Sequence, residues 1–269
     1  MTIVWGNIKA NLNNLEKSLC NLNPETDILV LPETFSTGFP TNTEPDELVK
    51  LIDDNSNKVI EAIQSLSARF NVSIAGSVIA TENGKFYNRA FFIKPDGCAV
   101  YADKKHLFSM AGESKIFTPG HHRLSVEYLG WNIAMVVCYD IRFPVWCRNR
   151  KNEYDLLLAV ANWPTVRINA WERLLPARAI ENEAYVVGVN CTGIDKQGYE
   201  YNGSSMILDY KGEKLGYGEG DFIYADLSLE KLRRFREKFP VWQDADVFSM
   251  GSVSLSVSEA SSHKPINLR

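Results

Sequence analysis

Cys138 has the sequence setting of a catalytic nucleophile. It follows the apolar run Ile133–Val137, which is typical of a buried strand, and precedes the segment Tyr139–Pro144. A strand that ends in a cysteine and turns sharply exposes the thiol at the carboxyl edge of a sheet, with the next backbone N–H groups directed at the same space. Acyl transfer needs this arrangement, because such donors stabilise the developing oxyanion. A free cysteine is also commonly a small buried hydrophobe, so the segment alone leaves a purely structural role open.

A catalytic cysteine needs a base or a cation, because a thiol with an unperturbed pKa of ~8.5 is mostly protonated at neutral pH. Of the four histidines, only His106 stands in a setting that resembles a site. The alternative is a carboxylate base with a lysine cation. Glu33 comes at the end of one buried-strand pattern and Lys104 follows another. Taken singly, Glu33 is also explained by a helix cap or a salt bridge, and the lysine pair at 104–105 by a solvated face.

The three strand ends can converge on one edge of a sheet, and the segments around them resemble the three signatures of the nitrilase superfamily (carbon–nitrogen hydrolases). These segments are Leu31–Glu33, Asp103–Phe108 and Val137–Pro144, in the order and spacing of the family. Within the superfamily, five further segments resemble the omega-amidases, also called 2-oxoglutaramate amidases: residues 32–39, 143–149, 161–164, 177–182 and 236–246. The resemblance runs from about Val4 to Phe248, nearly the whole chain.

The resemblance implies a Glu–Lys–Cys triad, with Glu33 as general base, Lys104 as the cation of the oxyanion site and Cys138 as nucleophile. Glu113 matches a second glutamate that helps to position Lys104 and the substrate. The implied reaction is hydrolysis of the terminal amide of a small dicarboxylic acid monoamide such as 2-oxoglutaramate, through a cysteine thioester. No metal or organic cofactor is expected. The alternatives are another amidase specificity, a carbamoylase, a nitrilase, or a catalytically inactive scaffold protein on the same fold.

The implied substrate carries a carboxylate, which the bidentate fork of an arginine suits. Arg142 lies shortly after Cys138, and Arg173 lies on the helix expected after residues 162–164. Arg142 can equally tie down its own loop by pairing with an Asp or Glu. A backbone N–H near Tyr139 is expected to hold the oxyanion. Three apolar side chains are candidate walls of the substrate site, although core packing also explains them: Phe39, Met110 and Trp163.

Short apolar runs predict the strands that carry these residues. Parts of these runs are continuous, as in sheets that are covered on both faces. The predicted strands are Ile28–Leu31, Val72–Ile79, Arg89–Ile93, Ile133–Val137, Leu156–Val160, Val186–Val189 and Ser205–Leu208. Apolar residues at helical spacing predict helices over residues 9–20, 46–69 and 165–184. Residues suited to tight turns mark 82–85, 95–97, 195–198 and 209–212.

The composition is that of an ordinary soluble globular protein. Its 269 residues are 45% hydrophobic and 23% charged, and no proline- or glycine-rich linker or internal repeat divides them. We therefore expect one α/β domain over residues 1–248. A serine-rich tail over 249–269 is expected to be loosely held, although its alternating phrase at 253–257 could add an edge strand.

Charge and cysteine content limit which partners and which cellular compartment we expect. A net charge of −4 gives no sign of a nucleic-acid surface. No apolar run approaches the ~18 residues of a membrane span, and the start of the chain does not resemble a signal peptide. Five cysteines without CxxC pairs argue against a disulfide framework and a zinc site, which favours the cytoplasm. We expect a small-molecule amide as partner, with no nucleic acid and no membrane.

The resemblance further implies a four-layer α-β-β-α sandwich and a homodimer that pairs through helices. The expected dimer surfaces are Phe143–Trp146 and the helix at 165–184. Members of the family usually open with a short apolar strand before the stretch that matches residues 3–7. Met1 falls about where that strand would already have ended, so we expect a sandwich that lacks it. A missing strand exposes its sheet neighbour and leaves backbone groups unpaired.

Overall fold

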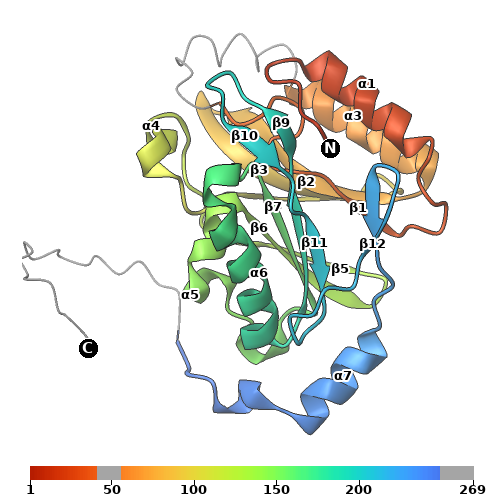
Figure 1. Ribbon diagram of the computed structural model, residues 1–269, viewed down its shortest axis with the longest axis vertical. Coiled ribbons are helices and arrows are strands. Elements are labelled where there is room, and N and C mark those ends of the chain that lie inside the picture. Colours follow the sequence, from red (N-terminus) through yellow and green to blue (C-terminus); the bar gives the residue numbers. More distant parts are fainter. Residues whose placement is uncertain (41–55, 249–269) are drawn as a thin grey trace, which may run out of the picture.

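Two β-sheets form the centre of the computed structural model, which describes residues 1–40 and 56–248 (Figure 1). In the first sheet the order is β1-β2-β3-β4, with β1 parallel to β2 and the other pairs antiparallel. In the second the order is β11-β8-β7-β6-β5, with β6, β7 and β8 parallel. The strands are β1 (Ile28–Val30), β2 (Ser73–Glu82), β3 (Lys85–Ile93), β4 (Ala99–Asp103), β5 (Leu124–Tyr128), β6 (Trp131–Val137), β7 (Leu156–Ala161), β8 (Tyr185–Asn190) and β11 (Met206–Leu208).

Helices cover the outer face of each sheet, as Figure 1 shows. The helices α1 (Ile8–Leu19) and α3 (Ser56–Phe70) lie on the first sheet, and α5 (Pro144–Cys147) and α6 (Ile168–Asn182) on the second. The smaller elements are α4 (Glu113–Ile116), α7 (Leu229–Lys238), β9 (Thr192–Ile194), β10 (Glu200–Asn202), β12 (Tyr217–Glu219), β13 (Phe222–Tyr224) and the 3-10 turns η1 (Ser109–Ala111), η2 (Cys138–Arg142), η3 (Arg150–Asn152), η4 (Thr165–Arg167) and η5 (Val241–Asp244). Within the described ranges, no helix has the length and apolar character needed to cross a bilayer.

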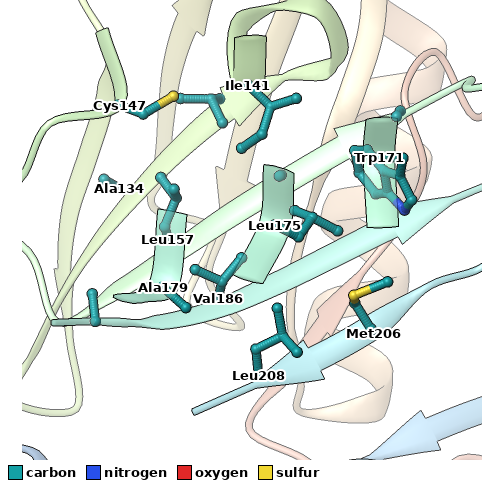
Figure 2. Close-up of a cluster of buried hydrophobic side chains, with 14 of the residues drawn as sticks. Ala134, Ile141, Cys147, Leu157, Trp171, Leu175, Ala179, Val186, Met206 and Leu208 are labelled. Atoms are coloured by element: carbon teal, nitrogen blue, oxygen red, sulfur yellow. The ribbon is translucent and has the colours of Figure 1, made fainter. Parts of the chain in front are cut away.

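Three apolar cores hold these layers together. One lies between the first sheet and its helices, where Ile63 of α3 packs among residues of β2 and β3. The second lies between the two sheets, where Phe92 of β3 shares a cluster with Met135 and Leu158. The third joins the second sheet to α6, and Figure 2 shows Trp171 and Leu175 among its members. The resulting order of layers is α-β-β-α, as expected from the sequence.

The seven predicted strands are all present, because each is an apolar run buried on one or both faces. The helix predicted over 9–20 is α1, and the one over 165–184 is η4 followed by α6. Of the helix predicted over 46–69, residues 56–69 lie in α3 and 46–55 lie outside the described residues. The same holds for the tail at 249–269 and its alternating phrase at 253–257. The turn at 83–84 connects β2 to β3, with φ values of 51° at Asn83 and 70° at Gly84.

Strand β1 ends the first sheet, and no strand in the described part of the chain pairs with its outer edge. A groove of about 830 Å³ lies beside it. Its lining comes from β1, from the start of the chain, α1 and the residues between α1 and β1, from strands of the second sheet and from the segment that contains β12 and β13. Ile28 and Val30 of β1 and Val187 of β8 are only partly buried there.

Candidate active site

The backbone at Cys138 makes the sharp turn that the sequence predicts. Cys138 follows β6 directly and begins η2, with a φ of +46°. This left-handed conformation is uncommon for a residue other than glycine, and such strained positions cluster at functional sites. The turn is anchored by Arg178 of α6, whose Nε and Nη2 atoms donate to the carbonyl of Ile141 at 3.0 and 2.8 Å. The thiol is therefore carried by a rigid turn between the sheet and α6.

Glu33 and Lys104 come from the first sheet and meet at one of its edges. Glu33 lies shortly after β1 and Lys104 directly after β4, and these two strands run in the same direction. Lys104 Nζ donates to Glu33 Oε1 at 3.0 Å, and both residues are almost fully buried. Across the space between the two sheets, the charges of Glu33 and Lys104 both act on the Cys138 thiol. The structure thus brings together the three residues that the sequence predicts as a triad.

Glu113 completes a buried cluster of charges around Lys104. It is the first residue of α4, and Lys104 Nζ donates to both of its oxygens, at 2.9 and 3.0 Å. The backbone N–H of Phe108 donates to the same carboxylate, which fixes its orientation. Glu113 therefore binds the same ammonium group as Glu33, and its positioning role stays a prediction.

The charges in this cluster determine the protonation of its members. Burial alone would lower the pKa of Lys104, but the carboxylates of Glu113 and Glu33 outweigh burial and hold the pKa well above its ordinary value. Burial and the charge of Glu33 raise the pKa of the Cys138 thiol well above its ordinary value, although Lys104 opposes the rise. Burial also raises the pKa of Glu113, against the effect of Lys104. The resting site thus holds a lysine cation and a neutral thiol, which needs a base.

Two asparagines that sequence reasoning did not assign to the site also contact Glu33. Asn88 of β3 donates from Nδ2 to Glu33 Oε1 at 2.7 Å. Asn162, which follows β7, donates its backbone N–H to Glu33 Oε2 at 2.9 Å and its side chain to the carbonyl of Glu33 at 2.9 Å. The sequence offered one signal for Asn88. Asparagine is depleted in strands, and this asparagine directly precedes a predicted strand.

His106 supports the turn at Cys138 and is not placed as a base for the thiol. Its Nδ1 atom lies 2.8 Å from Asp140 Oδ1, and its backbone N–H donates to the same oxygen at 2.8 Å. Asp140 Oδ2 accepts the backbone N–H of Val137 at 3.1 Å. The imidazole ring stacks on Phe143, with 3.8 Å between ring centroids. These contacts join the Lys104 segment to the Cys138 turn.

The predicted substrate-binding residues are only partly gathered at the site. Phe39 is near it, since Lys104 Nζ lies 5.4 Å from the centroid of its ring. Tyr139 follows Cys138, and the Arg142 guanidinium lies over the Trp163 ring at 4.8 Å. The sequence left open that Arg142 pairs with an acid of its own loop. Within residues 1–40 and 56–248, Arg142 forms no such ion pair.

Met110 and Arg173 are not brought to the triad. The side chain of Met110 is 90% exposed, so it forms no wall of the site in this structure. Arg173 is exposed on α6, and its Nε donates to Asn169 Oδ1 at 3.0 Å. The substrate-binding roles of these residues stay predictions.

The groove beside β1 is separate from this cluster, because none of Glu33, Lys104, Cys138 or Glu113 is among its lining residues. Across the part of the chain that the structure describes, no group of three His, Cys, Asp or Glu side chains is arranged to hold a metal ion. No residue is therefore assigned to a metal. What the cluster can do chemically is acyl transfer, because a thiol, a buried carboxylate and a lysine cation are gathered in one place.

Comparisons with known proteins agree with this chemistry. The family model for carbon-nitrogen hydrolases matches residues 1–237. The omega-amidase YafV of Yersinia enterocolitica is 43% identical over 91% of this chain and 94% of its own length. The 2-oxoglutaramate amidase of Bacillus subtilis is 31% identical over 90% of this chain and 93% of its own.

Among solved structures, the fold is similar to that of XC1258 from Xanthomonas campestris, a CN-hydrolase superfamily protein with an arsenic adduct in its active site. The TM-score is 0.85 at 35% identity, covering 93% of this chain and 96% of the other. This chain belongs to the carbon-nitrogen hydrolase family of the nitrilase superfamily and is a hydrolase of carbon–nitrogen bonds other than peptide bonds.

Proposed function

We propose that this enzyme hydrolyses the terminal amide of a small dicarboxylic acid monoamide such as 2-oxoglutaramate, giving the acid and ammonia. The observation that carries the proposal is the buried Lys104, which contacts Glu33 and Glu113 beside the neutral thiol of Cys138. Two relatives that match nearly the whole chain are named an omega-amidase and a 2-oxoglutaramate amidase, which supports this substrate class.

The geometry supports a two-step mechanism. Glu33 takes the thiol proton as Cys138 Sγ attacks the amide carbon, and Lys104 Nζ with the backbone N–H of Tyr139 holds the negative oxygen. One such donor can lower the barrier by ~3–4 kcal/mol. Glu33 then gives the proton to the departing nitrogen, so that ammonia leaves and a thioester remains. Water, deprotonated by Glu33, attacks the thioester, and the acid leaves as the proton returns to Cys138.

The distal carboxylate of the substrate is assigned to Arg142. The cation–π contact with Trp163 orients the guanidinium without neutralising it. An arginine held in this way keeps its donors free for a carboxylate. Phe39 supplies an apolar wall on the Lys104 side.

The assembly and compartment belong to the same proposal. The enzyme pairs as a homodimer through Phe143–Trp146 and α6, where Val145 and Ile180 are 56% and 55% exposed. Exposed apolar side chains on neighbouring elements favour an interface. The five cysteines are all free, which favours the cytoplasm. The partner is a small-molecule amide, and neither nucleic acid nor a membrane is required. Sedimentation equilibrium tests the dimer, and Val145→Asp is expected to yield monomers.

The test is ammonia release from 2-oxoglutaramate by the wild type and by Cys138→Ala. Release by the wild type alone supports both the substrate and the nucleophile. Cys147→Ala is a control for loss of a buried thiol, since Cys147 donates to the carbonyl of Asp140 and does not contact the triad. If a folded wild type releases no ammonia, the omega-amidase proposal fails, and other amides, nitriles and carbamoyl compounds are the next substrates to assay.

A further inference from the structure

Asn88 is a buried polar side chain in the middle of an apolar sheet. It lies in β3 opposite Ile79 of β2, and its exposed fraction is 0%. Its Nδ2 atom donates to Glu33 Oε1 at 2.7 Å, and its backbone carbonyl accepts the N–H of Lys104 at 2.9 Å. One residue of β3 thus contacts both members of the triad that come from the first sheet.

The hydrogen bonds of Asn88 indicate that the side-chain N–H donor, and not the side-chain oxygen, explains an asparagine at this position. In the described part of the chain, the buried Oδ1 atom has no hydrogen-bond partner. An unsatisfied buried acceptor lowers stability, so packing alone would favour an apolar side chain at this position. The bond from Nδ2 to Glu33 is the contact that an apolar residue would not provide.

The remaining contacts of Glu33 show what this donor does. A carboxylate has about four lone-pair positions. Asn88 Nδ2 and Lys104 Nζ use the two on Oε1, and the backbone N–H of Asn162 uses one on Oε2. The one position left is on Oε2, where the Cys138 thiol can donate. Lys104 is shared with both oxygens of Glu113, whereas the amide of Asn88 contacts Glu33 alone and does not titrate.

We propose that Asn88 is a positioning residue for the general base: its Nδ2 donor holds the Glu33 carboxylate so that one lone pair of Oε2 faces Cys138. Asn162 assists through its backbone N–H. This inference rests on the role of Glu33 in the proposed mechanism, and it is independent of which amide is the substrate.

Alkylation of Cys138 by iodoacetamide tests the proposal without any amide substrate. The thiol loses its proton to Glu33 and the sulfur displaces iodide from the reagent, so the rate reports how well the carboxylate is placed to take the proton. Peptide mapping by mass spectrometry separates Cys138 from the exposed Cys20 and Cys98, which serve as internal controls. Asn149→Leu is the matched variant. Asn149 is also a buried asparagine, with Nδ2 bonded to the carbonyls of Tyr154 and Asn182.

In Asn88→Leu, the alkylation rate of Cys138 at a fixed pH is expected to fall roughly 10-fold, because the Glu33 carboxylate loses the donor that orients it toward the thiol. The rates of Cys20 and Cys98 stay unchanged, and Asn149→Leu leaves the rate of Cys138 unchanged. If Asn88→Leu does not fold, the isosteric Asn88→Asp replaces it. Aspartate has no N–H to donate to Glu33, so the rate of Cys138 is expected to fall in this variant as well.

A folded Asn88 variant that alkylates Cys138 at the wild-type rate overturns the proposal, and so does an equal fall in rate in Asn149→Leu. Glu33→Gln separates this failure from failure of the mechanism. If Glu33→Gln leaves the rate of Cys138 unchanged, Glu33 is not the base and the proposed mechanism fails. If Glu33→Gln slows the alkylation of Cys138 and the Asn88 variants do not, only the role of Asn88 fails.

Discussion

Replacement of Lys104 by methionine is expected to destabilise the protein, and the loss of stability is expected to grow as the pH rises. Lys104 Nζ lies 2.9–3.0 Å from Glu33 and Glu113, and all three side chains are at most 1% exposed. Methionine has a similar length and no charge. The variant therefore leaves two buried carboxylates beside each other with no cation between them.

The magnitude follows from these distances. At an effective dielectric constant of ~20, each ion pair at 3 Å contributes about 5 kcal/mol of attraction. Protonation of one carboxyl relieves the repulsion, so the net loss for a broken buried pair is about 3–5 kcal/mol. At roughly 2–4 °C per kcal/mol for a chain of this size, the Tm falls by roughly 10 °C near neutral pH.

The sign of the pH dependence follows from the pKa of Glu113. It is already raised by burial, and Lys104 is the main group that opposes the rise, so the variant raises it further. A carboxyl whose pKa is higher in the folded state binds more protons when folded. Stability is then greatest at low pH and falls as pH rises from the ordinary pKa of a glutamate to the raised value, by up to ~1.4 kcal/mol per pH unit for one proton.

Differential scanning calorimetry between pH 5 and 8 measures this effect against Lys105→Met, which removes a neighbouring lysine with no partner in the cluster. The Tm deficit of Lys104→Met is expected to widen from pH 5 to pH 8, while that of Lys105→Met stays constant. A deficit that is the same at every pH, or a Tm equal to that of the wild type, would refute the electrostatic account of the cluster.

Two further substitutions test the substrate site and the core. Arg142→Ala removes the proposed carboxylate partner, so KM for 2-oxoglutaramate is expected to rise roughly 10-fold or more, with turnover of an amide that lacks a carboxylate unchanged; equal losses on both substrates would contradict the role of Arg142. Gly188→Ala in β8 places a Cβ 2.3 Å from Leu175 Cδ1, and overpacking of this kind costs about 1–3 kcal/mol. Thermal unfolding should show a lower Tm for Gly188→Ala than for Gly218→Ala, whose Cβ meets no atom within 4 Å; equal values would contradict the tight packing of α6 on β8.

The strands that the sequence predicts are those with a continuous or long apolar run. Such a run exists because both faces of the strand are covered, as in β7, where all six residues are buried. The strands β9, β10, β12 and β13 have three residues each and lack this signal. Strand β5 was missed although its residues alternate between buried and exposed, because the alternating pattern spans only five residues.

Glu33, Lys104 and Cys138 were noticeable in the sequence because each stands at the end of a strand, where a polar side chain after an apolar run is conspicuous, and the resemblance to the family supplied their expected roles. Asn88 was not, because it lies within β3 and the predicted strand began one residue later, at Arg89. Its proximity to Glu33 results from the pairing of β3 with β2 and β4, which no local pattern encodes. Met110 shows a different limit of sequence reasoning. Its apolar character predicted a wall of the site, whereas η1 turns its side chain to solvent.

The free edge of β1 has a consequence for how this enzyme is inactivated by heat. Within the described residues, β1 has three residues and a hydrogen-bonded neighbour on one side only, and Glu33 lies shortly after it. Edge segments of this kind open locally at a lower free energy than central strands. Backbone amides of β1 should therefore exchange with deuterium before those of β7. Glu33, the proposed general base, would leave its place while both sheets are still folded, so loss of activity on heating would precede the calorimetric transition.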